Sequence, residues 1–577
     1  MEDYRAKTPR FTKALDAILE KVSSGEKVCT LCEKQFEIAE EDIGLYRSLH
    51  VPPPTLCPDC RRRKRHVFVN YTTLFKRKCD APEHSEECIS MMPENAPYPV
   101  YDYAYWWSDA WDPMSFGREA DAEKSFFEDF GRLFEEVPQA AITRDPSSTN
   151  SDYTAYGFQQ KNCYYVFGGM QSEDVSYGNW AMMSRQCVDV LLPISCENGT
   201  HLVFSEKCYN CHYSYFSRDC MDSRFLYDCR NCTDCFGCVN LRNKKFCFLN
   251  EQLTEKEYKE RIAKIDFGSR SAMNEYSDQF WKLVKESPIR ATRNEKVINS
   301  TGNYLEGTKD CKDCYWIRQS ENCRYSEFSV QSKDCSDFTL SITSERLYET
   351  AGASNQVADI KFSYLIRMSQ DVEYSMQCYN CQHCFGCIGL RNKKYCIFNR
   401  QYEESEYWKI VDALKMKMLE RGEYGEFFPM RLSQFPYNAS FANITYPTGK
   451  KEALLAGAWW NDEEVSAQSP HEQFSAKETP DSIKDASDEL LQKVLTSEGN
   501  GKPFRVLETE LAHYRKNKIP LPLLSPHERL INRFAYVNYF RTFSDKCYHC
   551  GIEIKTSIAT ADGYKPYCEA CYQSEII

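Results

Sequence analysis

The chain has 577 residues, of which 42% are hydrophobic and 14% aromatic, and its formal net charge is -12. This length predicts several domains rather than one, and the acidic balance argues against a general affinity for nucleic acid. No run of about 18 apolar residues is present, which argues against a transmembrane helix. The charged opening segment also lacks the apolar centre of a secretory signal peptide. We therefore expect a cytoplasmic protein.

Cysteine is the most informative residue type in the sequence. The chain has 30 cysteines, and without an export signal most should be thiols, metal ligands or small buried apolar groups rather than disulfides. Six lie before residue 90, twenty lie between Cys163 and Cys396, and four lie near the C-terminus. The middle and the ends of the chain therefore use cysteine for different purposes.

The first cysteines form two close pairs, Cys29-x2-Cys32 and Cys57-x2-Cys60. Each pair fits a tight turn that offers two thiolates, and two such turns together make the tetrahedral four-sulfur shell that zinc favours. Four protein ligands leave no open coordination position. We therefore predict a structural rather than a catalytic zinc site.

A run of basic residues follows this predicted zinc site. The run consists of Arg61, Arg62, Arg63, Lys64 and Arg65. Beside a zinc site it can bind phosphates, which makes nucleic acid a candidate partner. It can also be a solvated helix start, or a patch that meets an acidic face of the same chain.

Two aromatic segments follow the basic run. "YDYAYWWSDAWDPM" is expected to pack the first module against the middle of the chain, with ligand stacking as the alternative. "EKSFFEDFGRLFEEVP" spaces its apolar side chains as on one face of a helix. These side chains are Phe126, Phe127, Phe130, Leu133 and Phe134. They predict a helix that faces the core.

In the middle of the chain, cysteines recur at intervals of nine residues. The longest series is Cys211, Cys220, Cys229, Cys238 and Cys247. A fixed short period indicates stacked units, and alternating aromatics with Asp or Asn at intervals indicate short strands broken by turns. We therefore expect a parallel β-solenoid with a ladder of small, buried cysteines inside it.

This middle region is duplicated. "CRNCTDCFGCVNLRNKKFCFLN" (229–250) and "CYNCQHCFGCIGLRNKKYCIFN" (378–399) are 149 residues apart and share 14 of 22 positions. Each is followed by a polar helical stretch, and in the first of these Thr254 is placed to cap the helix with Glu257 three residues on. Such a helix can close the end of a stack.

Two sharper interpretations of the middle region remain open. Each repeat holds four cysteines at three-residue spacing, which a zinc ion or an iron–sulfur cluster can use. These are Cys229, Cys232, Cys235 and Cys238, and Cys378, Cys381, Cys384 and Cys387. The alternative is a carbohydrate-active β-helix enzyme with paired acids. The carboxylates available to it are Asp219, Asp222, Asp228, Asp234, Asp334 and Asp337, all in turn-like steps where Asp commonly serves the backbone.

The C-terminal region repeats the chemistry of the N-terminal one. The segment "NDEEVSAQSPHEQFSAKETPDSIKDASDE" is polar and acidic and is expected to be a flexible link. Beyond it, four cysteines predict a second structural zinc site. The ligands are Cys547, Cys550, Cys568 and Cys571.

The two ends align with each other over a two-finger module. Residues 29–60 match residues 497–528, and "NYTTLFKRKC" (70–79) matches "NYFRTFSDKC" (538–547). The N-terminal copy keeps its first finger but has residues 82, 102 and 105 in place of the later cysteines of the second. The C-terminal copy keeps its second finger and has lost all four cysteines of the first. We expect packing by Phe504, Val506, Tyr514 and the "IPLPLL" run to hold the metal-free half.

These features together resemble one family. The zinc-ribbon modules, "WWSDAWDP", "CFGCVNLRNKKFC" and "IPLPLL" resemble the long cysteine-rich zinc-ribbon (treble-clef-like) proteins of uncharacterised function common in candidate-phyla (Patescibacteria-type) bacteria. The resemblance covers nearly the whole chain. Relatives keep cysteine at more finger positions, so it implies that two of the four fingers here have lost their metal.

The expected fold is multidomain α+β, with a duplicated parallel β-solenoid (β-helix-like) between zinc-ribbon, treble-clef-like modules. The expected segments are an N-terminal module with a helix (1–148), repeat 1 (149–250), a helical connector (251–298), repeat 2 (299–399), a helix (400–425), a linker (426–490) and the C-terminal module (491–577). We expect two Zn2+ ions per chain and no membrane association. The favoured function is a non-enzymatic scaffold or macromolecule-binding protein of unknown partner. The alternatives are the carbohydrate-active enzyme and a nucleic-acid-binding zinc protein.

Overall fold

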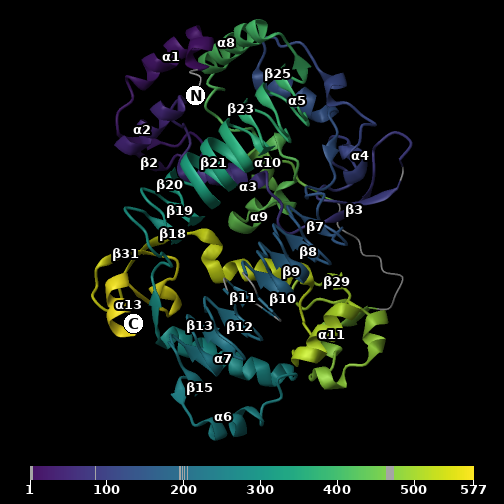
Figure 1. Ribbon diagram of the computed structural model, residues 1–577, viewed down its shortest axis with the longest axis vertical. Helices are drawn as coiled ribbons and strands as arrows, with labels where there is room; N and C mark the ends of the chain where they lie inside the picture. The colour runs from purple at the N-terminus through teal and green to yellow at the C-terminus, as the bar shows by residue number, and fades with distance from the viewer. Residues whose placement is uncertain are drawn as a thin grey trace. The chain divides into compact units, whose positions relative to one another are not determined.

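Two compact units make up the chain. A computed structural model describes residues 4–84, 86–193, 196–197, 199–200, 202–203, 206–462 and 473–576. One unit contains residues 1–142 and 293–462, and the other contains residues 143–292 and 463–577. Each unit therefore joins one terminal module to one long sheet, and the N-terminal module belongs with the second sheet along the chain (Figure 1).

The module of the first unit contains short helices and two-stranded hairpins. Its elements are η1 (Tyr4–Lys7), α1 (Pro9–Leu19), β1 (Gly25–Val28), β2 (Gln35–Ile38), α2 (Glu40–Leu49), α3 (Pro58–Val67), β3 (Phe75–Lys78), β4 (Glu87–Ser90), β5 (Val100–Tyr101), α4 (Tyr103–Trp107), η2 (Pro113–Phe116), α5 (Phe126–Glu136) and β6 (Gln139–Ala140). The pairs β1–β2 and β3–β4 are antiparallel, and β5–β6 is parallel.

The sheet of the first unit contains nine strands within the described residues. They are β18 (Gly302–Glu306), β19 (Cys314–Arg318), β20 (Glu321–Arg324), β21 (Glu327–Lys361), β22 (Tyr364–Arg367), β23 (Gln370–Glu373), β24 (Gln382–Phe385), β25 (Lys394–Ile397) and β26 (Arg400–Gln401). Helical segments follow: α8 (Glu404–Glu420), η3 (Met430–Leu432), η4 (Tyr437–Ala439), α9 (Ala442–Thr445) and α10 (Lys450–Leu455). Helix α8 lies beside α1 (Figure 1).

The second unit begins with a sheet that contains ten strands within the described residues. They are β7 (Thr154–Ala155), β8 (Tyr164–Phe167), β9 (Glu173–Asn179), β10 (Arg185–Leu191), β11 (Leu202–Val203), β12 (His212–Tyr215), β13 (Arg224–Tyr227), β14 (Thr233–Val239), β15 (Lys245–Phe248) and β16 (Glu251–Gln252). Helices α6 (Glu255–Ile262) and α7 (Arg270–Glu286) and strand β17 (Pro288–Arg290) follow. The predicted capping box of Thr254 and Glu257 is confirmed at the start of α6.

The module of the second unit is described from residue 473 onward. Its elements are β27 (Gln473–Ser475), η5 (Ala476–Glu478), η6 (Ile483–Asp485), η7 (Asp488–Gln492), β28 (Val494–Thr496), β29 (Pro503–Phe504), α11 (Glu508–Asn517), α12 (Pro526–Asn532), η8 (Arg533–Phe540), β30 (Phe543–Lys546), β31 (Glu553–Thr556), η9 (Thr560–Asp562), β32 (Lys565–Tyr567) and α13 (Glu569–Ile576). Residues 463–472 of the expected flexible link lie outside the described residues, whereas the stretch after them forms β27 and the turns η5 to η7.

Both long sheets share one register. Neighbouring strands pair in parallel with a 12-residue step, as in Cys235 with Cys247 and Cys384 with Cys396. Left-handed residues recur along these strands at three-residue intervals, for example Asp219, with a φ of 53°, and Asp222, with a φ of 49°. Asp and Asn tolerate this conformation better than most residues, which explains their frequency at the turns.

The nine-residue spacing of the cysteines has a different origin from the strand register. The Cys211 thiol donates to the carbonyl of Cys220 at 3.3 Å, and the Cys229 thiol donates to that of Cys238 at 3.4 Å. Nine residues therefore separate a thiol from its acceptor, whereas 12 residues separate paired positions. The prediction that these cysteines are buried is confirmed, because they form the cores of the two sheets.

The predicted fold class is wrong. The structure is mixed α/β, with several small sheets of mixed orientation, and no closed solenoid is found in the part of the chain that is described. Each long parallel sheet ends in an antiparallel strand, since β16 pairs antiparallel with β15 and β26 with β25. The prediction interpreted the nine-residue interval as the length of a structural repeat. In the structure this interval separates a thiol from the carbonyl group to which it donates.

The two aromatic segments of the first unit pack on its own sheet. The rings of Trp107 and Tyr379 have centroids 4.8 Å apart, and Arg391 Nη1 donates to the carbonyl of Trp107 at 2.8 Å. The five apolar side chains predicted to face the core from α5 are buried. Among them, Phe126 stacks on Phe398 with centroids 5.3 Å apart. Both segments therefore join the N-terminal module to the sheet of its unit.

Candidate metal centres

The first group of four cysteines lies at the junction of a hairpin turn and a helix start. Cys29 and Cys32 lie on the turn between β1 and β2, Cys57 is the N-cap of α3, and Cys60 lies in its first turn. The turn closes because the Glu33 amide donates to the Cys29 carbonyl at 3.0 Å. The four Sγ atoms all lie within 4.8 Å of one another.

The second group of four cysteines has the same construction in the second unit. Cys547 and Cys550 lie on the turn between β30 and β31, and the Gly551 amide donates to the Cys547 carbonyl at 2.9 Å. Cys568 directly precedes α13 and Cys571 lies in its first turn. Gly551 has a φ of 74°, a conformation that glycine adopts without strain. These four Sγ atoms also lie within 4.8 Å of one another.

The sulfur–sulfur distances fit a metal ion in each group. The Sγ atoms of Cys32 and Cys57 are 3.8 Å apart, and those of Cys550 and Cys568 are 3.9 Å apart. A metal ion roughly 2.3 Å from four tetrahedral thiolates would separate the sulfurs by roughly 3.8 Å. The two groups can therefore hold two metal ions, each with four protein ligands.

In each group the environment lowers the pKa of at least one thiol toward the thiolate form that a metal ion needs, while it raises the pKa of others, including Cys60 and Cys571. A hydrogen bond from the Cys60 thiol lowers the pKa of Cys57 to about 5. Burial raises the pKa of Cys547, but the backbone N–H groups of Cys550 and Cys568 outweigh it, and the net pKa is about 6. Each group therefore holds one thiol that ionises easily.

Polar side chains take the place of cysteine in the metal-free first finger of the C-terminal module. Ser497, Ser525 and Glu528 stand at the positions that match Cys29, Cys57 and Cys60. The Ser525 hydroxyl donates to Glu528 Oε2 at 2.8 Å, the Ser525 amide donates to Ser497 Oγ at 3.0 Å, and the Ser497 hydroxyl also donates to Glu528 Oε2. A hydrogen-bond network therefore joins the two turns that a metal ion would otherwise join.

Apolar packing supports this metal-free finger, as the sequence predicted. Phe504, Val506 and Tyr514 belong to one buried cluster with Ile519 and Leu521 of the "IPLPLL" run. The matching positions are also buried in the N-terminal first finger, where Ile38, Tyr46 and Val51 correspond to Val506, Tyr514 and Ile519. Apolar packing is therefore common to both fingers, and the replacement of the four cysteines is what distinguishes them.

The metal-free second finger of the N-terminal module keeps one cysteine. The Asp102 amide donates to Cys79 Sγ at 3.1 Å, as the Cys568 amide donates to Cys547 Sγ at 3.3 Å. Asp102 then caps α4, because its carboxylate accepts the amide of Ala104 at 2.9 Å. A helix cap thus stands where the intact finger has a metal ligand.

The basic run after the first finger is bound by carboxylates of its own unit. Arg61, Arg62 and Arg65 are buried. Arg61 makes a bidentate pair with Asp337, through Nε and Nη2 at 2.9 Å each, and Arg65 Nη1 lies 3.1 Å from the same carboxylate. Arg62 Nε lies 2.7 Å from Glu327. The patch therefore meets an acidic face of the same chain, one of the alternatives that the sequence left open.

The rest of the basic run is bound within the same unit. Arg63 Nε donates to the hydroxyl of Tyr437 at 3.0 Å. Lys64 Nζ lies 3.4 Å from Glu426 Oε2, and its side chain is largely buried. All five basic residues of the run therefore have partners in the first unit.

The same docking contact occurs in the second unit. Arg529 and Arg533, which match Arg61 and Arg65, both bind Asp189, at 3.1 and 2.7 Å. Asp189 precedes Asp337 by 148 residues in the duplicated sheets. Each unit therefore fixes its module to its sheet with two arginines on one buried aspartate.

A tyrosine on each sheet completes the docking contact. The hydroxyl of Tyr325 donates to Asp42 at 3.1 Å, and that of Tyr177 donates to Glu510 at 3.1 Å. Arg65 also donates to the carbonyl of Tyr325 at 3.1 Å, a bond that Arg533 repeats on Tyr177. Sequence reasoning missed these contacts. The pairs lie in register only when the two internal alignments are extended beyond the segments given above, at offsets of 468 and 148 residues.

The cysteines of the sheets form no ligand group. Within the described residues, only the two groups above bring three or more candidate ligands within 4.8 Å of one another. Burial raises the pKa of Cys229, Cys314 and Cys378 well above the usual range, so these thiols stay protonated. Neutral thiols that donate to carbonyls act as small apolar groups in a core.

The aspartates considered as catalytic acids adopt left-handed backbone conformations at turns, and two of them also form ion pairs. All six have a left-handed backbone, with φ between 48° and 54°. Asp228 and Asp337 are buried, and each lies beside arginines: Arg242 Nη2 is 3.1 Å from Asp228. These two aspartates are therefore structural.

Comparison with models of known protein families gives no match, and comparison with curated proteins gives none either. In the described ranges, no helix is long and apolar enough to cross a membrane.

Proposed function

We propose that the chain is a zinc protein in which two closed four-cysteine centres stabilise the terminal modules, and that it acts without catalysis as a scaffold or macromolecule-binding protein. The single observation that carries this proposal is the grouping of eight cysteines into two sets of four, with the Sγ atoms of each set within 4.8 Å of one another. Four thiolates are the ligand set of structural zinc sites, whereas catalytic zinc keeps one position open for water or substrate.

The long sheets support the binding part of the proposal. A polar hollow of about 640 Å³ lies on the sheet of the second unit and includes the ion pair of Lys161 with Glu173. A hollow of about 560 Å³ lies on the other sheet and includes Glu321, which pairs with Lys309 at 2.9 Å. These two pairs occupy matching positions in the duplicated sheets. A repeated polar surface suits contacts with a polar macromolecule.

The geometry weighs against the other two functions considered from the sequence. Nucleic-acid binding through the basic run needs guanidinium groups that can reach phosphates, yet Arg61, Arg62 and Arg65 are buried on carboxylates. Of the six aspartates considered for the cleavage of a polysaccharide, Asp228 and Asp337 are buried beside arginines, which removes these two as catalytic acids.

Metal content tests the proposal. Inductively coupled plasma mass spectrometry of the purified full-length chain should count about two zinc ions and no iron. Cys57→Ser and Cys568→Ser should each lower the count to about one, whereas Cys229→Ser in the sheet core should leave it at two. Iron in the protein, or a count that falls in Cys229→Ser, would overturn the proposal.

A further inference from the structure

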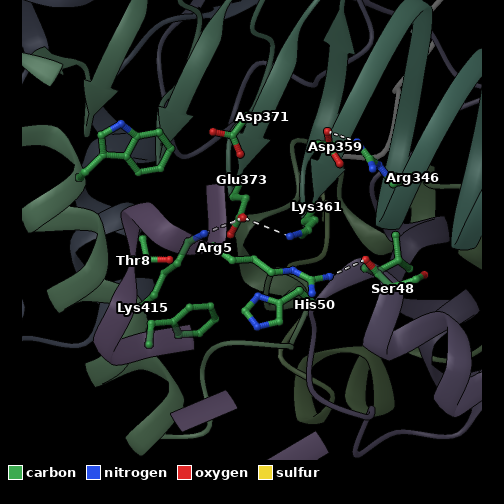
Figure 2. A pocket seen from close by; sticks show the side chains of 13 residues that line it. Arg5, Thr8, Ser48, His50, Arg346, Asp359, Lys361, Asp371, Glu373 and Lys415 are labelled. Atoms are coloured by element: carbon green, nitrogen blue, oxygen red, sulfur yellow. Dashed lines mark hydrogen bonds and ion pairs between the residues drawn. The ribbon is translucent and has the colours of Figure 1, made fainter. Parts of the chain in front are cut away.

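A cavity of about 350 Å³ lies in the first unit, where the end of α2 meets the long sheet (Figure 2). The sheet contributes Asp371 and Glu373, the module contributes Arg5 and His50, and α8 contributes Lys415. Phe11 and Trp408 form an apolar part of the wall. Figure 2 shows Glu373 between the amino groups of Lys415 and Lys361, and Asp359 beside Arg346.

Positive charge exceeds negative charge in this cavity. The lining contains four cations, Arg5, Arg346, Lys361 and Lys415, and three carboxylates, Asp359, Asp371 and Glu373. Burial, together with Lys361 and Arg5, lowers the pKa of His50 to about 4, so this ring is neutral at pH 7. The net charge of the lining is therefore +1, in a chain whose formal net charge is -12.

Each of the three carboxylates already has a close partner. Glu373 lies 2.7 Å from Lys415 Nζ and 3.5 Å from Lys361 Nζ. Asp359 pairs with Arg346 at 2.6 Å, and Asp371 pairs with His383 at 2.7 Å. These carboxylates therefore do not indicate a binding site for a cation.

The second unit has a cavity of about 310 Å³ at the matching place. There the end of α11 contributes Lys516, Asn517 and Lys518, which match residues 48–50 of the first module. The sheet contributes Asp222 and Arg224, which match residues 371 and 373. In both modules the helix ends in a left-handed residue beside the cavity, with a φ of 54° at residue 50 and 52° at residue 518.

This second cavity also has a net charge of +1. Its lining contains three cations, Arg224, Lys516 and Lys518, and two carboxylates, Asp222 and Asp234. Arg224 donates to the carbonyl groups of Asn517 and Lys518 at 2.5 and 3.3 Å, and no carboxylate of the described residues pairs with it. Burial lowers the pKa of this guanidinium to about 10, as expected for a charge without a close counter-ion.

We propose that each of these two cavities binds one small anion that carries a carboxylate or phosphate group. Arginine and lysine donors bind such oxyanions through charge-assisted hydrogen bonds. The volumes suit a small metabolite rather than a macromolecule. In the first unit, Phe11 and Trp408 can cover the carbon part of the ligand. The position was kept in both copies although the side chains changed, which points to a shared ligand chemistry.

Equilibrium dialysis of the zinc-loaded full-length chain tests the proposal, with radiolabelled inorganic phosphate in one experiment and radiolabelled succinate in the other. At constant ionic strength, two anions should bind per chain. Binding of phosphate alone identifies a phosphate-type ligand, and binding of succinate alone identifies a carboxylate-type ligand. Binding of neither at any millimolar concentration would overturn the proposal.

Variants assign the two sites. Arg5→Gln should weaken binding in the first cavity by about tenfold or more, and Lys516→Gln should do the same in the second. Both side chains are exposed, so their replacement should not prevent folding. The zinc content of each variant should stay at two. Lys13→Gln, on the exposed face of α1 and outside the cavity, is the matched control. Two sites of unchanged affinity in both cavity variants would contradict the assignment.

Discussion

The first fingers of the two modules share a frame but differ in what holds it. In the N-terminal module four cysteines converge on one point between β1, β2 and α3. In the C-terminal module Ser497, Ser525 and Glu528 form hydrogen bonds at the same place. Both fingers nevertheless fix their modules to a sheet through two arginines on one aspartate.

This difference separates two roles: stabilising the frame of the finger and positioning the finger on its sheet. The sequence alone does not distinguish them. Because the docking contact occurs in both units, it does not depend on a metal ion in the first finger. Because the metal-free finger has a buried apolar cluster and a hydrogen-bond network in place of the cysteines, its frame has sources of stability other than a metal ion. We therefore expect a metal ion to stabilise the N-terminal finger locally, and the arginine pairs to fix each finger on its sheet.

Loss of a metal ion from the first group of cysteines should have the largest effect on stability. This effect should be confined to the N-terminal finger. Cys57→Ser removes one of four ligands, and structural zinc contributes roughly 10–16 kcal/mol of apparent binding free energy in isolated fingers. We expect hydrogen exchange to lose protection over residues 25–67. Protection of the matching residues 493–535 should not change, and unaltered protection in both fingers would contradict the comparison.

Loss of the docking aspartate should have the next largest effect, and it should differ between the units. Asp189→Asn leaves Arg529 and Arg533 without their shared carboxylate, which costs about 3–5 kcal/mol for a buried pair. Asp337→Asn should cost less, because Glu349 lies 3.5 Å from Arg61 and 3.7 Å from Arg65. In the second unit, among the described residues, Glu510 contacts Arg529 but not Arg533. Urea unfolding followed by hydrogen exchange can assign each loss to its unit. Equal losses would mean that Glu349 gives no compensation.

The same Glu349 predicts a pH dependence of the first unit. Burial and the charge of Asp337 raise its pKa from 4.5 to about 7. The folded state therefore binds the proton more tightly than the unfolded state, so this contribution to stability is complete below pH 4.5. It is lost as the pH rises through 7, by roughly 3 kcal/mol in total.

Glu349→Gln should abolish this pH-dependent part of the stability of the first unit. Glu345→Gln, an exposed carboxylate on the same strand, is the matched control and should keep the dependence. The free energy of unfolding, measured in urea at pH 5, 6, 7 and 8, checks both variants. A wild-type stability that does not decline between pH 5 and 7 would contradict this role of Glu349.

Local spacing was enough to predict the metal centres and the helix starts. Cysteine pairs two residues apart need only a tight turn, and the capping box of Thr254 and Glu257 needs only one helical turn. Both signals lie within a few residues along the chain, so their geometry follows from backbone dimensions.

The sheet register and the docking contacts could not be predicted in the same way. A thiol reaches a carbonyl nine residues ahead while strands pair at 12 residues, so the cysteine period alone gives the wrong register. Arg61 and Asp337 are 276 residues apart in the chain, and no local pattern joins them. Only the fold shows that a basic run is a buried contact rather than an exposed patch.

The smallest effect on stability is expected when the hydrogen-bond network of Ser497, Ser525 and Glu528 is disrupted. This network occupies the place of the four cysteines in the other module. Ser525→Ala removes the N-cap of α12, whose hydroxyl accepts the Glu528 amide at 3.3 Å, and should cost about 1 kcal/mol. Asn500→Ala, at the exposed position that matches Cys32, should change stability by less than about 0.5 kcal/mol. Neither variant should alter the metal count. If Ser525→Ala instead unfolds its finger as completely as Cys57→Ser unfolds the other, the network rather than the apolar cluster holds the metal-free frame.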